Sequence, residues 1–224
     1  MTTTARTGTK CLHLGCGEVI GAHWENVDSS PNVLLDNHPL LRATLAAFLP
    51  ASSRKRKFTG AAYLDLRSKW PYQNATFDAV YSSHVFEHFS IDDGLHVLRE
   101  SHRVLKPGGR IRFLLPTVEH EVARYLALKE TREPLAATRF AQALHIFSSP
   151  PPGPHWYRLF FRLYDKNIHK MLYDAESLQH YFADSGFVKV RCAQFLDSSV
   201  PYIDEVELEN RFEGAVCVEA ERRW

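Results

Sequence analysis

The chain has 224 residues, of which 45% are hydrophobic and 24% are charged, and its formal net charge is +1. This is the composition of an ordinary globular protein, long enough for one large domain or two small ones. The balanced charge argues against a general attraction to nucleic acid or to a membrane surface. The sequence contains no run of about 18 apolar residues, so no membrane span is predicted.

The N-terminal half alternates short apolar runs with segments of helical periodicity. The apolar runs predict strands at residues 11–14, 24–27, 61–66, 79–82 and 111–115. Helical spacing predicts helices at residues 39–49 and 90–105, the second capped by Ser90 and ended by the KPGG at 106–109. The segment from Gly17 to Asp28 is short for a full helix, so we expect a reduced or distorted helix there.

The C-terminal part predicts one more helix and two strands. Asp174 is placed to cap a helix that ends at Gly186, and strands follow at residues 188–195 and 215–220. No helical segment long enough for a crossover separates these strands, so they should form an antiparallel hairpin. The segment at about 119–173 is less regular, and its SSPPPGPHWY stretch predicts an insertion or lid.

Together these elements predict one domain over residues 1–224 with an α/β fold. Strands that alternate with helices imply right-handed crossovers and a parallel, doubly wound sheet. We therefore expect a Rossmann-like α/β/α sandwich, with a mostly parallel sheet that closes in a C-terminal antiparallel hairpin strand.

The first predicted strand runs into an incomplete nucleotide-binding loop. Gly15 and Gly17 are in place, but Ile20 occupies the position of the third glycine in G-x-G-x-x-G. A pyrophosphate needs all three glycines, so the charged group at this loop should be smaller. Asp28 follows the second strand, and its two carboxylate oxygens suit the two hydroxyls of a ribose.

Polar groups also follow the third and fourth strands. Asp65 could accept a hydrogen bond from an adenine amino group, and Ser82 and Ser83 are small polar residues at the end of the fourth strand. Ligands of open α/β sheets bind at the carboxyl ends of the strands. Four neighbouring strand ends therefore offer groups suited to a nucleoside.

Five segments in chain order carry a family resemblance over about residues 10–116. LHLGCG, NVDSSP, LDL, FDAVYSSHVFEHF and RVLKPGGRIRFLLP resemble successive motifs of the class I S-adenosylmethionine-dependent methyltransferases. They most resemble the small bacterial branch with LGCG and VLKPGG.

The resemblance implies S-adenosyl-L-methionine as the cofactor and gives each strand end a role. The glycine loop would approach the methionine part, Asp28 would hold the ribose, and Asp65 and Leu66 would flank the adenine. Ser82 and its neighbours would line the sulfonium side. The cofactor-binding residues that we predict are Gly15, Cys16, Gly17, Asp28, Ser29, Asp65, Leu66, Ser82, Ser83 and His84.

The sequence HVFEH at 84–88 also matches H-x-x-E-H, an inverted zinc-protease pattern. That pattern needs a helix that presents both histidines, plus a further ligand. Here it directly follows a strand and overlaps a methyltransferase motif, so we expect no metal. We expect His84 to face the cofactor pocket, and His88 to pack or to face substrate.

A general base, where the acceptor needs one, should come from outside the cofactor motifs. The segment HIFSSPPPGPHWYRLFFRLYDKNIHKMLYD, residues 145–174, is the most obvious source, and we predict His169 with Tyr173, then His155, as catalytic residues. The acceptor atom, the need for a base, the oligomeric state and the pathway stay open.

Negative observations narrow the acceptor. The sequence LPTVEHE after the fifth strand is not the Asn/Asp-Pro-Pro-aromatic motif of DNA amino methylation, and no Pro-Cys nucleophile is present. We therefore expect an oxygen or nitrogen of a small molecule, such as a sugar, a natural-product intermediate or a modified peptide. The alternatives are a non-catalytic partner protein with this fold, or a nicotinamide-dependent oxidoreductase, which the missing third glycine disfavours.

The four cysteines of the chain bear on its compartment. They form no C-x-x-C pair and have no zinc-finger spacing. This favours free thiols in a reducing cytosol, and the polar N-terminus lacks a signal-peptide stretch. We therefore expect a cytoplasmic protein.

Overall fold

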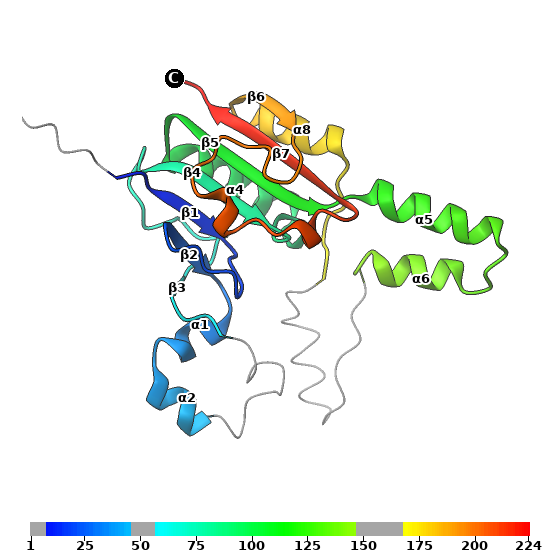
Figure 1. The fold of residues 1–224 in the computed structure, drawn as a ribbon, viewed down its shortest axis with the longest axis horizontal. Coiled ribbons are helices and arrows are strands. Elements are labelled where there is room, and N and C mark those ends of the chain that lie inside the picture. The colour runs from blue at the N-terminus through cyan, green and yellow to red at the C-terminus, as the bar shows by residue number, and fades with distance from the viewer. Residues whose placement is uncertain (1–7, 46–56, 147–167) are drawn as a thin grey trace, which may run out of the picture.

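A seven-stranded sheet forms the centre of the computed structural model, which describes residues 8–45, 57–146 and 168–224 (Figure 1). The strand order is β3-β2-β1-β4-β5-β7-β6, and β7 is antiparallel to both of its neighbours. The predicted mostly parallel, doubly wound sheet with a C-terminal antiparallel hairpin is confirmed. The strands are β1 (Cys11–Leu14), β2 (Trp24–Asp28), β3 (Ala61–Tyr63), β4 (Phe77–Ser83), β5 (Leu105–Pro116), β6 (Phe187–Cys192) and β7 (Ala215–Arg222).

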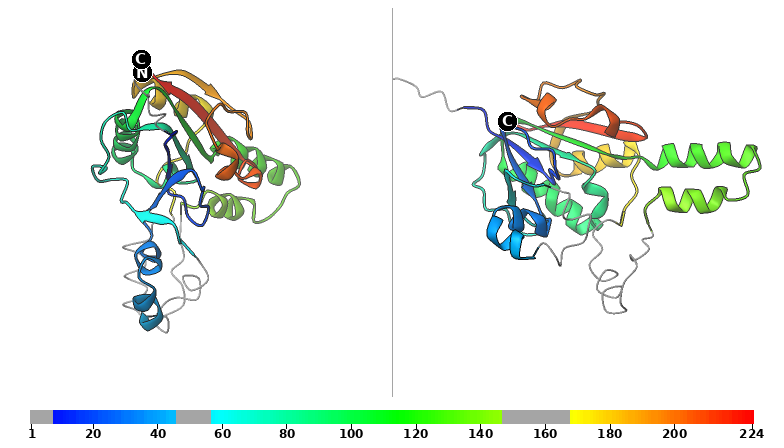
Figure 2. Two further views of the ribbon diagram at one scale, coloured as in Figure 1. Left: turned by 60° about the vertical axis from the view of Figure 1, so that its left-hand side comes forward. Right: turned by 60° about the horizontal axis from the view of Figure 1, so that its bottom comes forward.

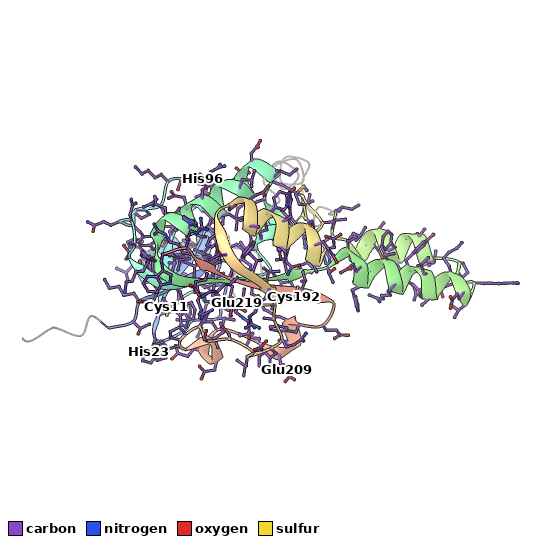
Figure 3. All side chains as sticks on the ribbon, turned by 90° about the horizontal axis from the view of Figure 1, so that it is seen from above. Cys11, His23, His96, Cys192, Glu209 and Glu219 are labelled. Atoms are coloured by element: carbon purple, nitrogen blue, oxygen red, sulfur yellow. The ribbon has the colours of Figure 1, made fainter. Side chains whose placement is uncertain are left out.

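Two amphipathic helices, α4 (Ile91–Val104) and α8 (Ala175–Asp184), cover one face of the sheet. The Ser90 hydroxyl accepts the Asp93 N–H at the start of α4, and Asp174 caps α8 in a capping box, as predicted. Leu98 and Phe182 are fully buried in the main core that these helices form with the strands. In Figure 3, His96 marks this helical side of the sheet.

The opposite face is covered by the connection between β6 and β7, residues 193–214. This connection contains the 3-10 helices η2 (Ile203–Glu205) and η3 (Glu209–Arg211), which lie on the far side of the sheet from α4 (Figure 3). Ile203 and Val206 pack with Trp24 and Tyr81, and the Trp24 indole N–H donates to the Tyr202 carbonyl at 2.9 Å. The predicted hairpin therefore has a long connection that builds a layer of its own.

This layer occupies the place of a helix between β1 and β2. Residues 15–23 contain no helix at all, so the expected reduced helix is absent from this described segment. The physical reason is length, because a parallel crossover with its own helix needs a dozen or more residues. The apolar face that such a helix would bury is covered instead by residues from the far end of the chain.

A buried ion network ties this connection to the sheet. Arg112 of β5 is fully buried, and its guanidinium donates to both carboxylate oxygens of Glu207, at 2.8 and 3.0 Å. It also donates to Glu219 at 3.3 Å and to the carbonyls of Gln194 and Asp197. Five donors therefore meet five acceptors, which is the condition under which a buried charge is tolerated.

The remaining helices lie around the carboxyl edge of the sheet and beyond it. Helices α5 (Val118–Glu130) and α6 (Ala136–Ala143) form a hairpin that stands away from the sheet in Figure 1 and in the right-hand view of Figure 2. These two helices lie in the segment that the sequence marks as irregular. The SSPPPGPHWY stretch itself falls outside the described residues. The helices are α1 (Pro31–Asp36), α2 (Pro39–Leu45), the 3-10 helix η1 (Phe86–His88), α5 (Val118–Glu130) and α6 (Ala136–Ala143).

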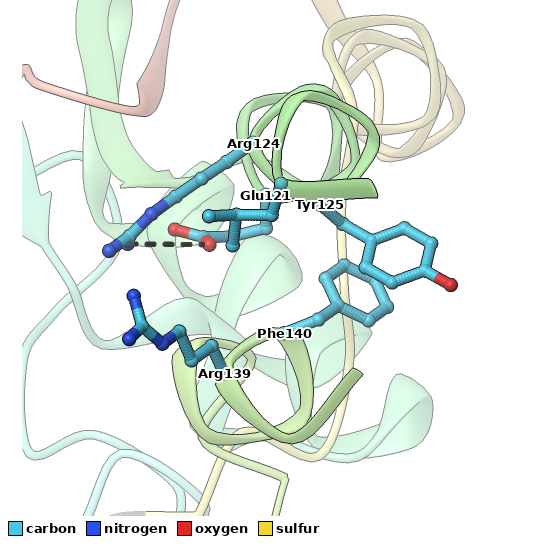
Figure 4. Close-up of a pocket in the computed structure, with 6 residues that line it drawn as sticks. Glu121, Arg124, Tyr125, Arg139 and Phe140 are labelled. Carbon is cyan, nitrogen blue, oxygen red and sulfur yellow. Dashed lines mark ion pairs between the residues drawn. The ribbon is translucent and has the colours of Figure 1, made fainter. Parts of the chain in front are cut away.

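The helical hairpin is held together by its own side chains. The rings of Tyr125 and Phe140 meet with their centroids 5.1 Å apart, and Arg124 turns back toward Glu121 of the same helix (Figure 4). The cavity between the two helices has a volume of about 10 Å³. That is room for about one water molecule, so this cavity is too small for a substrate.

Several element boundaries differ from the sequence expectations. The third strand ends at Tyr63 rather than at residue 66, and β5 begins at Leu105. The KPGG segment ends α4 as predicted, but it forms a bulge inside β5, where the pairing with β4 shifts register. No helix in the described part of the chain is long and apolar enough to cross a membrane. All four cysteines are free thiols, as predicted.

Candidate functional site

The glycine loop and Asp28 form one unit at the carboxyl edge of the sheet. Gly15 and Gly17 have φ of +60° and +57°, which favours glycine at both positions. The Gly17 N–H donates to one Asp28 carboxylate oxygen at 3.0 Å, and the Ser30 N–H donates to the other at 2.6 Å. Both oxygens are thus oriented beside the loop, and each keeps a further lone pair to accept from a ligand.

The space around this loop differs between its two glycines. A Cβ on Gly17 would meet nothing within 4 Å, so the loop is open there. A Cβ on Gly15 would lie 2.4 Å from Val85, which packs directly against it. Between them, Cys16 is buried, and burial raises the pKa of its thiol to about 12. Cys16 therefore shapes the loop, and its thiol does not face a ligand as a charged group.

The residues that follow β3, Asp65 and Leu66, are constrained by contacts within the protein. The Arg67 guanidinium donates to both Asp65 carboxylate oxygens, at 2.9 and 2.7 Å. Asp65 would have to accept an adenine amino group on its remaining lone pairs. The Leu66 side chain is buried in the main core, which leaves only its backbone for the ligand. Ser29, beside Asp28, is half-buried.

The end of β4 turns sharply where the polar residues begin. The Ser82 hydroxyl donates to the Leu14 carbonyl at 3.3 Å, which ties β4 to β1. His84 has a φ of +55°, a left-handed conformation that is uncommon outside glycine, and such residues cluster at functional sites. Arg211 of η3 donates to the Ser83 carbonyl at 3.3 Å, and its own carbonyl lies 3.1 Å from His84 Nε2.

Beyond His84 lies a cavity of about 470 Å³. It is bounded by the ends of β4 and β5, by α5, and by residues on both sides of the undescribed segment 147–167. Its lining is rich in titratable groups: His84, Glu87, His88, His120, Glu121, Arg124, His145, His169 and Glu213.

The predicted catalytic residues take different positions relative to this cavity. His169 lines it. Tyr173 is buried in the main core against the ring of Phe86, with centroids 5.3 Å apart, and burial raises the pKa of its hydroxyl. The structure therefore brings His169 to the cavity but places Tyr173 behind it. His155 lies outside the described residues.

Glu87 is the residue at this site that the sequence reasoning missed. Its side chain is 2% exposed, and neither carboxylate oxygen has a hydrogen-bond partner among the described residues. One oxygen lies 3.8 Å from His84 Nδ1 and 3.9 Å from the Nε2 atoms of both His88 and His169. Burial raises the pKa of Glu87 to about 8. The H-x-x-E-H spacing was the available signal, although it did not reveal the third histidine.

Main-chain hydrogen bonds bring His169 to Glu87. The N–H groups of Lys170 and Met171 donate to the Glu87 carbonyl, at 2.9 and 3.2 Å, and the His169 N–H donates to the His145 carbonyl at 3.1 Å. Burial, followed by the neighbouring His88, His145 and His84, lowers the pKa of His169 to about 4. His169 is therefore a neutral imidazole at physiological pH.

The site thus has two halves that meet at His84. One half is the glycine loop with Asp28, and the other is the titratable cavity. Residues 12–113, which hold the first half and the H-x-x-E-H segment, match the methyltransferase domain family. This match covers 102 of the 224 residues and supports a methyltransferase over the nicotinamide-dependent alternative.

The chain is also similar to solved structures. A chain of the complex between the Haloferax volcanii Trm112 methyltransferase activator and a methyltransferase has 15% identity over 97% of this chain and 84% of that chain, with a TM-score of 0.48. A Haemonchus contortus phosphoethanolamine N-methyltransferase has 13% identity over 99% of this chain and 51% of that chain, with a TM-score of 0.49. A Thermotoga maritima methyltransferase, described as a possible histamine N-methyltransferase, has 15% identity over 96% of this chain and 83% of that chain, with a TM-score of 0.46.

Proposed function

We propose that this methyltransferase binds S-adenosyl-L-methionine at the glycine loop and methylates an oxygen or nitrogen of a small molecule held in the adjoining cavity. The observation that carries the proposal is the Asp28 carboxylate, oriented by the Gly17 and Ser30 N–H groups beside an open loop. This arrangement suits a ribose diol, because a carboxylate can accept from both hydroxyls at once.

The loop itself favours a nucleoside without phosphates. A pyrophosphate is bound by three glycines and the N-terminus of the helix that follows them. Here Ile20 replaces the third glycine, and no helix follows in residues 15–23. The amino-acid tail of S-adenosylmethionine needs neither feature. We place Cys16 in this loop through its backbone, with Ser29, Asp65 and Leu66 nearby as further contacts of the nucleoside.

When bound, S-adenosylmethionine supplies a methyl group on a sulfonium, which is already activated for transfer. The task of the protein is then to align the acceptor and to exclude water. Ser82, Ser83 and His84 stand where the loop half meets the cavity, so they would border the transferred methyl. His84 is fixed there by the Arg211 carbonyl.

The cavity favours a small acceptor. Its volume of about 470 Å³ lies within the range of small-molecule pockets, about 300–1,000 Å³. The many acidic and histidine side chains suit a polar acceptor with hydroxyl or amino groups. Where the acceptor must lose a proton, His169 is the proposed base, because it lines the cavity. The free cysteines support a reducing compartment such as the cytoplasm.

The proposal is tested by product detection in a metabolite extract. The protein is incubated with the extract and with S-adenosylmethionine carrying a labelled methyl group, and new labelled products are sought by mass spectrometry. We expect a labelled small molecule with the wild type and none with Asp28→Ala, whereas Asp92→Ala on the exposed face of α4 should match the wild type. Label found only in macromolecules would contradict the small-molecule acceptor.

A further inference from the structure

The buried Glu87 carboxylate accepts no hydrogen bond from the part of the chain that the structure describes. A polar group that is buried without a hydrogen bond loses its interaction with water and gains none in return, and the cost is larger when the group is charged. Glu87 is nearly fully buried, and both of its oxygens lack a hydrogen-bond partner among the described residues. Such a group in a native structure calls for an explanation, such as a catalytic role or a bound ion.

Histidine nitrogens surround this carboxylate. Nε2 of His88 and Nε2 of His169 each lie 3.9 Å from the same Glu87 oxygen. One ligand atom from each of these three residues lies within 4.8 Å of the other two. This is a His₂Glu set, the protein ligand set of catalytic zinc sites that keep a fourth position for water or substrate.

The backbone contacts of the His88 and His169 imidazoles also favour a metal-binding set. His88 Nδ1 lies 3.1 Å from the Ile168 carbonyl, and a carbonyl only accepts, so this nitrogen carries the proton. A backbone hydrogen bond with Leu144 also acts on the His169 imidazole. A neutral imidazole that donates on one side presents a lone pair on the other, here toward Glu87. Metal-binding histidines are commonly oriented by a backbone carbonyl in this way.

The distances allow a metal after a modest movement of the side chains. Ligand atoms about 2.0–2.1 Å from a tetrahedral zinc ion are about 3.4 Å apart. The separations of 3.9 Å between the Glu87 oxygen and the two nitrogens would close by about 0.5 Å on binding, and the two nitrogens, which lie within 4.8 Å of each other, would close by up to about 1.4 Å. Glu87 and His88 share the short helix η1, and His169 is held to it by main-chain hydrogen bonds, so the frame is already assembled.

We propose that Glu87, His88 and His169 form a site for a divalent transition-metal ion, zinc in the first instance, that opens into the cavity. This reverses the sequence expectation of no metal. The objection there was that the H-x-x-E-H segment lacks a helix and a further ligand. The structure supplies the 3-10 helix η1 and, 81 residues later, His169.

The metal would also change how the cavity acts on an acceptor, and this part rests on the proposed function. A bound hydroxyl or amine in the open coordination position would lose its proton more readily, because a metal lowers the pKa of the group it binds. His169 would then be a ligand and not a base. The metal would orient the acceptor atom beside His84, where the two halves of the site meet.

The test uses the full chain after removal of metal with a chelator. Zinc is titrated by calorimetry, and cobalt(II) is titrated by visible absorption, which reports tetrahedral coordination. We expect one ion per chain in the wild type, and at least about a hundredfold weaker binding in Glu87→Gln and in His169→Ala. His120→Ala is the matched control, since His120 lines the same cavity outside the set, and it should bind like the wild type.

Two results would overturn the metal site. One is no saturable binding by the wild type, and the other is equal binding by the wild type, Glu87→Gln and His169→Ala. Circular dichroism shows whether each variant is folded, and His88→Ala provides a third ligand deletion if one of them is not. S-adenosylmethionine is titrated into the same metal-free samples. Cofactor binding without metal binding would reject the metal site and leave the proposed function standing. Metal binding without cofactor binding would support the metal site and contradict the proposed function.

Discussion

Replacement of Arg112 by methionine should strongly destabilise the protein. The substitution removes both hydrogen bonds from Arg112 to the Glu207 carboxylate and leaves that buried group with the Leu196 N–H alone. Glu219 keeps Arg191 and the Ser198 hydroxyl, so most of the cost falls on Glu207. Two hydrogen bonds to a charged group are worth about 3–6 kcal/mol.

We therefore expect Arg112→Met to lower the free energy of unfolding by about 3–5 kcal/mol, or the melting temperature by about 6–20 °C. Urea unfolding at pH 7 measures this change. Arg139→Met removes an exposed ion pair and should cost less than about 1 kcal/mol. The double variant Arg112→Met/Glu207→Gln should recover part of the loss, because it removes the unpaired charge. A cost for Arg112→Met no larger than that of Arg139→Met would refute the role assigned to this network.

Two further predictions concern the glycine loop and a buried histidine. Gly15→Ala should lower the free energy of unfolding by about 1–3 kcal/mol more than Gly17→Ala does. Both glycines have positive φ, but only a Cβ added at Gly15 would meet Val85. Equal costs of the two substitutions in urea unfolding would show that this contact relaxes freely. Burial lowers the pKa of His13 to about 3, although the hydrogen bond from its Nδ1 to the Asn26 side-chain oxygen acts to raise it. The neutral His13 therefore stabilises the fold above its unfolded pKa of 6.5, and this stability is lost as the pH falls. Between pH 7 and pH 5 the wild type should lose about 2 kcal/mol more than His13→Gln, and parallel pH profiles for the two proteins would contradict the shifted pKa.

The sheet and its helical face could be predicted because their signals are local. Ser90 caps α4, apolar residues recur at helical spacing along it, and the KPGG segment ends it. The apolar runs of β1 and β4 each end at glycine or serine, which marks the carboxyl edge of the sheet. These features need only short stretches of sequence, and the position of Asp28 follows from the end of β2.

The second face could not be predicted, because its partners are far apart in the chain. Nothing near Trp24 indicates that Tyr202 and Val206 will cover it. The α5–α6 hairpin was missed for a related reason: α5 buries no residue and packs mainly on α6, so its sequence lacks a strong apolar face.

The candidate site likewise has one part that could be predicted from the sequence and one part that could not. The glycine loop and Asp28 lie within one short segment, so their juxtaposition could be inferred. The approach of His169 to Glu87 depends on main-chain hydrogen bonds between segments about 80 residues apart. Sequence spacing could nominate the H-x-x-E-H segment but could not supply its third member. Tyr173 follows His169 closely in the chain, yet it points into the core, where it packs on Phe86.

We expect the strand ends around Asp28 to bind the nucleoside of S-adenosylmethionine. Titration calorimetry of the wild type and of Asp28→Ala with S-adenosylmethionine tests this binding. Two lost hydrogen bonds to a carboxylate correspond to about 3–6 kcal/mol, or a loss of affinity of about a hundredfold or more. We expect saturable heat from the wild type and none from Asp28→Ala at the same concentrations. A folded wild type that gives no heat, or an Asp28→Ala variant that binds as tightly as the wild type, would contradict the account.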